Sequence, residues 1–268
     1  MSHILRENDR KIYFEHYSGS KTAIVLIHGW GTSCRIWDTT LVALRAAGHA
    51  VVMFDQRGCG QSDKDFVLNS IDAGADDAIA ILKHLGIQRA VFNGWSLGGA
   101  IAVAAASRME TDCAGLVLTA AASPRYVQAP DYPYGGAPGS TAATVAVMRQ
   151  DRANFFDALT KAVCAEPQSQ AMHVWMWSQF MQTSPCADDS LAELDIIDQR
   201  ALLEKLQAPV LSFVGTKDVV VAPEVCRSVA KYAQNCKLVE FENCGHAPFV
   251  EDGARYREAL LGFLASVH

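Results

Sequence analysis

The stretch Gly94-Trp95-Ser96-Leu97-Gly98-Gly99 decides the fold of this chain. The apolar run Ala90-Val91-Phe92 precedes it, and a run of small residues, 100–106, follows it. This order predicts a strand, a tight turn and a helix that meet at Ser96. Glycine suits positions 94 and 98 because side chains there would collide where the strand and the helix cross. The pattern G-x-S-x-G arises by chance in roughly one chain in ten of this length, so its neighbours must support it.

The composition indicates a globular protein built around one large core. The chain has 268 residues, of which 50% are hydrophobic and 19% are charged, and its formal net charge is −6. This length accommodates one core, or one core with an inserted subdomain. Because the charge is mild and Lys and Arg do not cluster, we expect neither nucleic acid nor an anionic membrane as a partner.

No segment predicts export or membrane insertion. Residues 1–10 are polar and lack the apolar centre of a signal peptide. No apolar run approaches the roughly 20 residues of a membrane span. The eight cysteines form neither a C-x-x-C motif nor a cluster with histidine, so we expect free thiols, no metal site and a cytoplasmic location. Cys59 and Cys244 adjoin the motifs described below, which suggests sensitivity to oxidation.

Strand-like and helix-like segments alternate along most of the chain. Apolar, β-branched runs predict strands at residues 12–17, 23–27, 50–54, 90–93, 116–120, 210–214 and 237–241. Stretches of helical period predict helices at residues 34–47, 71–85, 97–109, 223–233 and 254–266. This alternation predicts an α/β protein with a doubly wound, mostly parallel sheet that helices cover on both faces.

The alternation breaks between residues 123 and 195. Prolines and glycines crowd the first part of this segment, and helical sequence such as 172–182 follows. An inserted helical cap explains the break better than a separate domain does. We therefore predict a core of residues 1–122 and 196–268 with a cap at residues 123–195.

Ser96 and His246 are the predicted nucleophile and base. On a strained strand-to-helix turn the serine hydroxyl projects from the sheet edge, and the next residue offers its N–H to an oxyanion. Acyl transfer then needs a neutral imidazole to take the hydroxyl proton. His246 lies in a loop between the last predicted strand and the last helix, where ligands bind in doubly wound sheets. The alternative interpretation of His246 is an ordinary surface histidine.

Asp218 is the predicted acid that orients the histidine. It follows the predicted strand 210–214, and its alternative role is that of a turn residue. The strand at 116–120 ends without a carboxylate, and Asp195 and Asp198 lie at the exit of the cap rather than at a strand end. The order Ser96, Asp218, His246 is the one expected of an α/β-hydrolase.

Two backbone amides, those of Trp30 and Leu97, are predicted to hold the oxyanion. Glycines on either side of Trp30 let the loop turn its amides inward, and each such donor is worth on the order of 3 kcal/mol in the transition state. We expect His28 to be structural, tying this loop by hydrogen bonds. The segment Asp55-Gln56-Arg57-Gly58-Cys59-Gly60-Gln61-Ser62 predicts a turn scaffold rather than a nucleotide site, since the third glycine and the opening helix are missing.

The chain resembles the α/β-hydrolase superfamily along nearly its whole length. Small carboxylesterases and cofactor-free haloperoxidase-like esterases are the most similar branches, and three motifs also resemble pimeloyl-[acyl-carrier protein] methyl ester esterases: His28-Gly-Trp-Gly, Gly94-Trp-Ser-Leu-Gly-Gly and Gly245-His-Ala-Pro-Phe. The resemblance implies that Trp30, Ser96, Leu97 and His246 line the site of the substrate carbonyl.

The sequence departs from these relatives in two respects, and each narrows the activity that we expect. Perhydrolytic relatives typically carry proline after the oxyanion-loop tryptophan, whereas this chain has Gly31, so we expect weak perhydrolysis. The cap also lacks a cationic cluster to receive a carrier protein, since Arg125, Arg149, Arg152 and Lys161 are scattered.

The cap contributes the expected substrate pocket. Trp175, Trp177, Phe180 and Met181 would form an apolar wall over Ser96 together with Trp30, although helical spacing is also typical of internal packing. The tyrosines in the Pro/Gly-rich entry to the cap would line the mouth or stiffen the loop; they are Tyr126, Tyr132 and Tyr134.

The sequence thus predicts a serine hydrolase of carboxylic esters that needs no cofactor or metal. Its expected partner is an uncharged, small ester or lactone, and a homo-oligomer is compatible with the sequence. A lactonase or a C–C bond hydrolase with the same triad is the alternative. Haloperoxidase-like perhydrolysis and a ligand receptor that scarcely turns over are weaker alternatives, and a serine at 96 argues against aspartate-nucleophile chemistry.

Overall fold

The sheet of this protein has eight strands among residues 2–267, which are the residues that the computed structural model describes. The strands are β1 (Ser2–Leu5), β2 (Lys11–Tyr17), β3 (Lys21–Ile27), β4 (His49–Phe54), β5 (Ala90–Trp95), β6 (Cys113–Thr119), β7 (Val210–Gly215) and β8 (Cys236–Phe241). Their order is β1-β2-β4-β3-β5-β6-β7-β8. The pairs β1–β2 and β2–β4 are antiparallel, and all the others are parallel.

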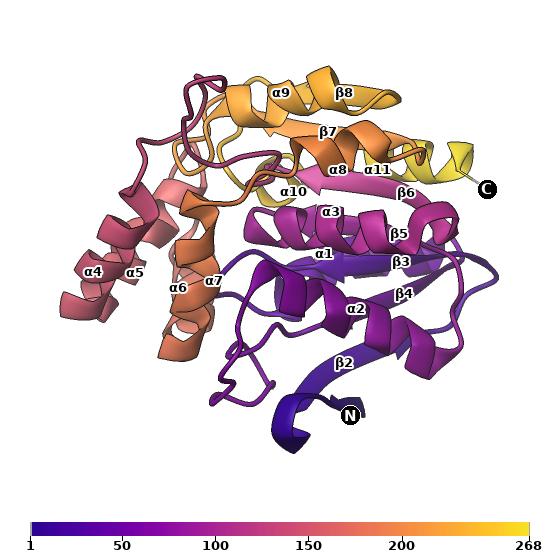
Figure 1. Ribbon diagram of the computed structural model, residues 1–268, viewed down its shortest axis with the longest axis horizontal. Helices are drawn as coiled ribbons and strands as arrows, with labels where there is room; N and C mark the ends of the chain where they lie inside the picture. Colours follow the sequence, from indigo (N-terminus) through magenta and orange to yellow (C-terminus); the bar gives the residue numbers. More distant parts are fainter. Residues whose placement is uncertain (1, 268) are drawn as a thin grey trace.

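Helices cover both faces of the sheet, as Figure 1 shows. The α-helices are α1 (Asp38–Ala46), α2 (Ile71–Leu85), α3 (Leu97–Met109), α4 (Ser140–Gln150), α5 (Arg152–Val163), α6 (Gln170–Met181), α7 (Asp188–Ala192), α8 (Arg200–Lys205), α9 (Pro223–Tyr232), α10 (Pro248–Glu251) and α11 (Gly253–Ser266). Helices α2, α3, α8 and α9 lie on one face, and α1 and α11 lie on the other.

The two faces of the sheet form two separate hydrophobic layers. In β3, Val25 and Ile27 join the layer that contains α2 and α3, whereas Ile24 and Leu26 join the layer that contains α1 and α11. All four side chains are fully buried. Strands buried on both faces are continuously apolar, which is why these segments stood out in the sequence.

Helices α4 to α7 form the cap helices, which stand beyond the carboxyl ends of the strands at the left of Figure 1. They lie in the chain between β6 and β7. Helix α8 also lies between β6 and β7, but it packs against α3 and α9 on the sheet and therefore is not one of the cap helices. Residues 123–195 therefore remain our proposed extent of the cap. Within residues 2–267, no helix combines the length and the apolar character that crossing a membrane requires.

The predicted α/β class with a doubly wound, mostly parallel sheet is confirmed. Helices α2 and α3 have the predicted bounds. The predicted helix 34–47 instead begins as a 3₁₀ turn, Cys34–Trp37, and the predicted strand 116–120 runs over Cys113–Thr119. It ends there because Ala120 has a φ of 43°, which is incompatible with an extended strand. Strand β1 was not predicted.

Candidate active site

Ser96 occupies a strained turn between β5 and α3. Its φ of 56° and ψ of −124° lie outside the regions that non-glycine residues ordinarily adopt. A Cβ at Gly94 would collide with the backbone of Gly98, and one at Gly98 would collide with the backbone of His28. The Ser96 amide donates to the Thr119 carbonyl at 3.1 Å, which fixes the turn against β6. The glycines therefore permit the close strand–helix crossing that presents this serine.

His246 and Asp218 form a buried pair at the carboxyl ends of β7 and β8. His246 Nδ1 lies 2.7 Å from Asp218 Oδ2, and both residues are almost inaccessible to solvent. The other carboxylate oxygen accepts the amides of Val220 and Val221 at 2.8 and 2.9 Å. A proton held on Nδ1 by this carboxylate leaves Nε2 as the free basic nitrogen of a neutral ring. Ser96 and His246 line the same cavity.

The amides of Trp30 and Leu97 are free to bind an oxyanion. Within residues 2–267, neither amide donates a hydrogen bond to a protein acceptor. Leu97 is the first residue of α3, where helix amides lack intrahelical partners and the helix dipole favours negative charge. Trp30 follows β3, and its indole Nε1 donates to the carbonyl of Ala187 in the cap at 2.7 Å. The ring thus fixes the loop that carries the Trp30 amide.

His28 is a structural residue beneath this loop. The ring is fully buried, and its Nε2 accepts the amide of Gln56 at 3.0 Å. Its Nδ1 lies 2.7 Å from the carbonyl of Gly29, which implies a proton on that nitrogen. Burial lowers the pKa of His28, so the ring is neutral. His28 does not line the cavity at Ser96, in agreement with its predicted role.

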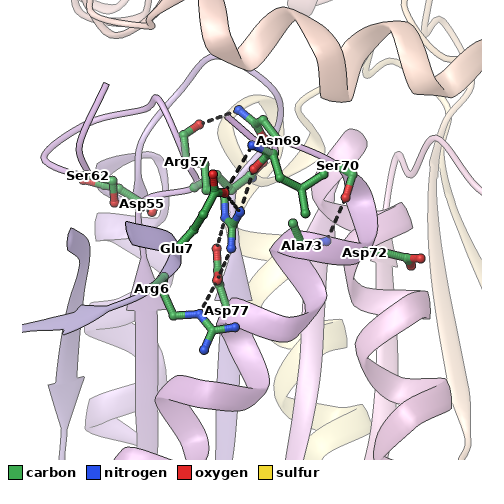
Figure 2. A network of polar contacts seen from close by, with 12 residues as sticks. Arg6, Glu7, Asp55, Arg57, Ser62, Asn69, Ser70, Asp72, Ala73 and Asp77 are labelled. Carbon is green, nitrogen blue, oxygen red and sulfur yellow. Dashed lines mark hydrogen bonds and ion pairs between the residues drawn. The ribbon is translucent and has the colours of Figure 1, made fainter. Parts of the chain in front are cut away.

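The segment 55–62 is a turn scaffold, as predicted. The Asp55 carboxylate accepts the amides of Cys34 and Gln61, both at 2.7 Å. Arg57 makes a two-pronged ion pair with the buried Asp77, with N–O distances of 2.7 and 2.9 Å, as Figure 2 shows. Because a two-pronged pair fixes the orientation of both side chains, it holds Arg57 and the turn in one position against Asp77.

Asn69 extends this scaffold to the cap. Its Nδ2 donates to the carbonyl of Arg57 at 3.1 Å and to that of Cys186 at 3.0 Å. The indole of Trp30 binds the neighbouring Ala187. The turn scaffold and the loop that carries Trp30 therefore hold the same stretch of the cap, at Cys186 and Ala187.

The cavity at Ser96 is small and apolar. Its volume is about 90 Å³, against about 300–1,000 Å³ for pockets that hold drug-sized ligands. The lining residues are Gly29, Trp30, Trp95, Ser96, Tyr126, Thr144, Phe155, Leu159, Val163, Phe180, Leu191, Val220 and His246. None of these is Asp, Glu, Lys or Arg. A larger surface hollow, of about 560 Å³ between α5 and α6, is not lined by Ser96.

The structure brings only part of the predicted pocket to Ser96. Trp30 and Phe180 line the cavity, but Trp175, Trp177 and Met181 do not. Trp175 instead faces a surface hollow together with Phe249. The Trp177 indole donates to the carbonyl of Ala153 at 3.1 Å, and Met181 is 36% exposed. One helix presents only one face to a cavity, so consecutive large residues on α6 cannot all reach it.

Most cap residues that do line the cavity were missed by sequence reasoning. The missed residues come from α4, α5 and α7, and they are Thr144, Phe155, Leu159, Val163 and Leu191. The α5 residues recur at helical spacing, which was the available signal. Tyr126 was expected to line the mouth or stiffen the loop, and it does both, because its hydroxyl donates to the Val220 carbonyl at 2.9 Å. Tyr132 is fully buried away from the cavity, against Ser228.

Cys59 and Cys244 are protected thiols. Both are buried, and burial raises the pKa of Cys59 to about 12 and that of Cys244 to about 11. Because the thiolate is the reactive form, both side chains are poorly reactive near neutral pH. This burial opposes the oxidation sensitivity that their sequence positions suggested. All eight cysteines are free.

Comparison with known proteins places the fold in one family. A family model described as alpha/beta hydrolase fold matches residues 22–253. The chain therefore belongs to the alpha/beta hydrolase family.

Individual relatives connect the chain to esterases. It is similar to a pimeloyl-[acyl-carrier protein] methyl ester esterase from Neisseria meningitidis, with 27% identity over 91% of this chain and 94% of that protein. Its structure is similar to that of an esterase from Exiguobacterium antarcticum, with a TM-score of 0.93, 25% identity and coverage of 98% and 99% of the two chains. A bromoperoxidase from Bacillus anthracis gives a TM-score of 0.92 with 26% identity, covering 98% of this chain and all of that one. The family and these relatives together indicate a hydrolase of the esterase type.

Proposed function

We propose that this protein is a serine hydrolase of short, uncharged carboxylic esters. The observation that carries the proposal is the meeting of Ser96 and His246 in one cavity, with His246 bound to the buried Asp218. In the first half of the reaction, Ser96 Oγ attacks the ester carbonyl while His246 Nε2 accepts the hydroxyl proton. The amides of Trp30 and Leu97 bind the oxyanion.

The second half of the reaction releases the alcohol and the acid. The protonated His246 donates its proton to the leaving oxygen as the ester C–O bond breaks, which leaves an acyl group on Ser96. Water then attacks the acyl carbonyl and gives its proton to His246, and Ser96 recovers its hydroxyl proton as the acid departs. Asp218 stabilises the imidazolium in both halves. No cofactor takes part in this sequence of steps.

The size and polarity of the cavity support a short acyl group. A volume of about 90 Å³ lined by aromatic and aliphatic side chains suits an acetyl to butyryl group rather than a long chain. A lining without Lys or Arg offers no counter-charge to a substrate carboxylate or phosphate. A lactone is a cyclic ester and remains a second candidate with the same triad.

The charges of the cap argue against a carrier protein attached to the acyl part of the substrate. Acidic neighbours within this chain already pair with three of the scattered cations. Arg149 lies 2.9 Å from Asp188, and Lys161 lies 2.6 Å from Asp157. Arg125 lies 3.5 Å from the carboxylate of Asp198. An acidic carrier would need free cations on this surface, so we propose an acyl group that carries no protein.

Gly31 supports hydrolysis over peroxide chemistry. Its φ is +76°, and a Cβ at this position would crowd the ring of Phe180. Proline has a φ near −65°, so this loop cannot accommodate it without changing its path. The oxyanion loop therefore differs in backbone conformation from one that has proline after the tryptophan. Weak perhydrolysis stays our prediction.

Steady-state hydrolysis of p-nitrophenyl esters tests the proposed function. We expect turnover of the acetate and butyrate, and a kcat/KM for the octanoate that is lower by at least about 100-fold. Even one or two misfit methylenes in an apolar pocket cost this much, at about 1–3 kcal/mol each, and octanoate is longer than butyrate by more than that. A fluorophosphonate probe should label Ser96, and butyrate ester should compete with it. Tight binding of the ester without turnover would favour the receptor alternative, and a preference for octanoate would contradict the short acyl group.

Phe180→Ala should widen the acyl range. Phe180 lines the cavity and stacks on Phe156 with ring centroids 5.4 Å apart. Its removal should raise the octanoate-to-butyrate ratio of kcat/KM by about tenfold. Met181→Ala on the same helix is the matched control, and it should leave the ratio unchanged because Met181 is outside the cavity. Loss of a buried phenylalanine ring lowers the free energy of unfolding by about 3–5 kcal/mol, so a thermal melt must accompany the kinetics. Equal octanoate-to-butyrate ratios in both variants would show that Phe180 does not limit the length of the acyl group.

A further inference from the structure

Glu251 joins the loop of the candidate base to the cap. It is the last residue of α10, and its side chain turns back toward the chain before that helix. One carboxylate oxygen accepts the amide of Gly245 at 2.8 Å, next to His246. The other accepts the amide of Ala165 at 2.7 Å, just beyond the end of α5. One side chain thus binds the loop of the base with one oxygen and the cap with the other.

The two segments that Glu251 joins also touch directly. The amide of His246 donates to the carbonyl of Val163 at 2.7 Å. A Cβ at Gly245 would collide with the amide nitrogen of Ala165, so glycine is needed for this approach. The side chain of Val163 lines the cavity at Ser96. The cavity wall and the backbone of the base are therefore neighbours at this point.

Backbone amides, rather than a positively charged side chain, hold the carboxylate of Glu251. Within residues 2–267 its carboxylate lies in no ion pair with Lys, Arg or His. Charge-assisted hydrogen bonds to backbone amides are roughly twice as strong as neutral ones. Arg255, which lines the same surface hollow as Glu251, donates to the carbonyl of Glu240 instead. The half-buried charge is therefore held by backbone amides.

We propose that Glu251 is a positioning residue, which holds the His246 loop against the end of α5 so that the imidazole and the cavity wall keep one relative placement. This inference rests on the proposed ester hydrolysis. Glu251 acts through the backbone, because its carboxylate binds the amide of Gly245 rather than the imidazole. Misplacement of a reacting group by about 1 Å can cost about 100-fold in rate, so loosening this clamp should lower the rate of the chemical step.

Glu251→Gln tests the clamp, with Glu258→Gln as the matched control. The amide side chain of glutamine has only one acceptor oxygen, so one of the two backbone amides loses its partner. We expect kcat for p-nitrophenyl butyrate to fall about tenfold while KM changes less than twofold. Fluorophosphonate labelling of Ser96 should slow by a similar factor. Glu258 is exposed on α11, and its variant should behave as the unaltered protein does.

Ala165→Pro removes the same hydrogen bond from the side of the cap. The preceding residue, Cys164, has a φ of −109° and a ψ of 145°, which is the extended conformation that proline requires before it. This variant should lower kcat as Glu251→Gln does, and the double variant should lose no more than the more impaired single variant. Active sites are counted by labelling to completion, so that unfolded protein does not lower the apparent kcat.

The outcomes separate this inference from the proposed function. A thermal melt that is lowered by Glu251→Gln with kcat per active site unchanged would make Glu251 merely structural and overturn the inference. Fully additive losses in the double variant would show that the two changes act independently, and would also overturn it. If the unaltered protein itself hydrolyses no ester, then the proposed function fails instead.

Discussion

Ser96→Ala should lower kcat for p-nitrophenyl butyrate by at least about 10⁴-fold. The hydroxyl is the only atom of this residue that can form the acyl intermediate, and the strained turn presents it to the cavity shared with His246. Alanine has no side chain beyond Cβ, so the oxyanion donors and the base would have no nucleophile to assist. Any remaining rate would come from water positioned near the free amides.

The fold should survive this change. The Ser96 hydroxyl makes no hydrogen bond to another residue within 2–267, so its loss leaves no buried group without a partner. Ser107→Ala, near the other end of α3, is the control for a lost hydroxyl, and it should retain full turnover. Fluorophosphonate should label the control variant and not Ser96→Ala. Comparable turnover in both variants would refute the assignment of Ser96 as the nucleophile.

Asp218→Asn should lower kcat by about 10³- to 10⁴-fold. The carbonyl of asparagine can keep the hydrogen bonds from Val220 and Val221, so the loop should hold its shape. Its NH₂ group would then face His246 Nδ1, which must give up its proton to accept that hydrogen bond. The proton moves to Nε2, and the nitrogen that should accept the serine proton becomes a donor.

Asp198→Asn is the control that distinguishes the two candidate acids. Asp198 lies at the exit of the cap and pairs with Arg200 at 2.6 Å and with Arg125 at 3.5 Å. Its neutralisation affects exposed ion pairs, which contribute little to stability, so activity should stay within about twofold of the unaltered protein. Stopped-flow and steady-state hydrolysis of the same ester measure both variants. A large loss with Asp198→Asn and a small one with Asp218→Asn would reverse the assignment of the acid.

Local patterns predicted the elements of the core well where one strong signal decided them. Helix α2 has its predicted bounds because Ser70 accepts the amide of Ala73 at its start and Gly86 adopts a left-handed conformation at its end. Such caps act over a few residues and are visible in the sequence. The parallel strands were equally visible, because burial on both faces makes them continuously apolar.

The elements that the sequence missed depend on partners far away in the chain. Strand β1 is short and largely exposed, and it forms only because its backbone pairs with β2 at the edge of the sheet. Its four residues, Ser2-His3-Ile4-Leu5, are too few to form a recognisable apolar pattern of their own. The contacts of Glu251 could not be predicted for the same reason, since the amide of Ala165 lies 86 positions away.

The sequence by itself determined the fold class and the candidate triad. The carboxyl ends of parallel strands lie side by side, so residues in the loops that follow them, such as Ser96, Asp218 and His246, gather there. Only the tertiary structure decided which cap side chains face the serine. It selected Phe180 over Trp175, Trp177 and Met181. The physical reason is that rotation of a short helix about its axis is set by its packing against other segments, and an apolar run around the whole helix leaves that rotation undetermined.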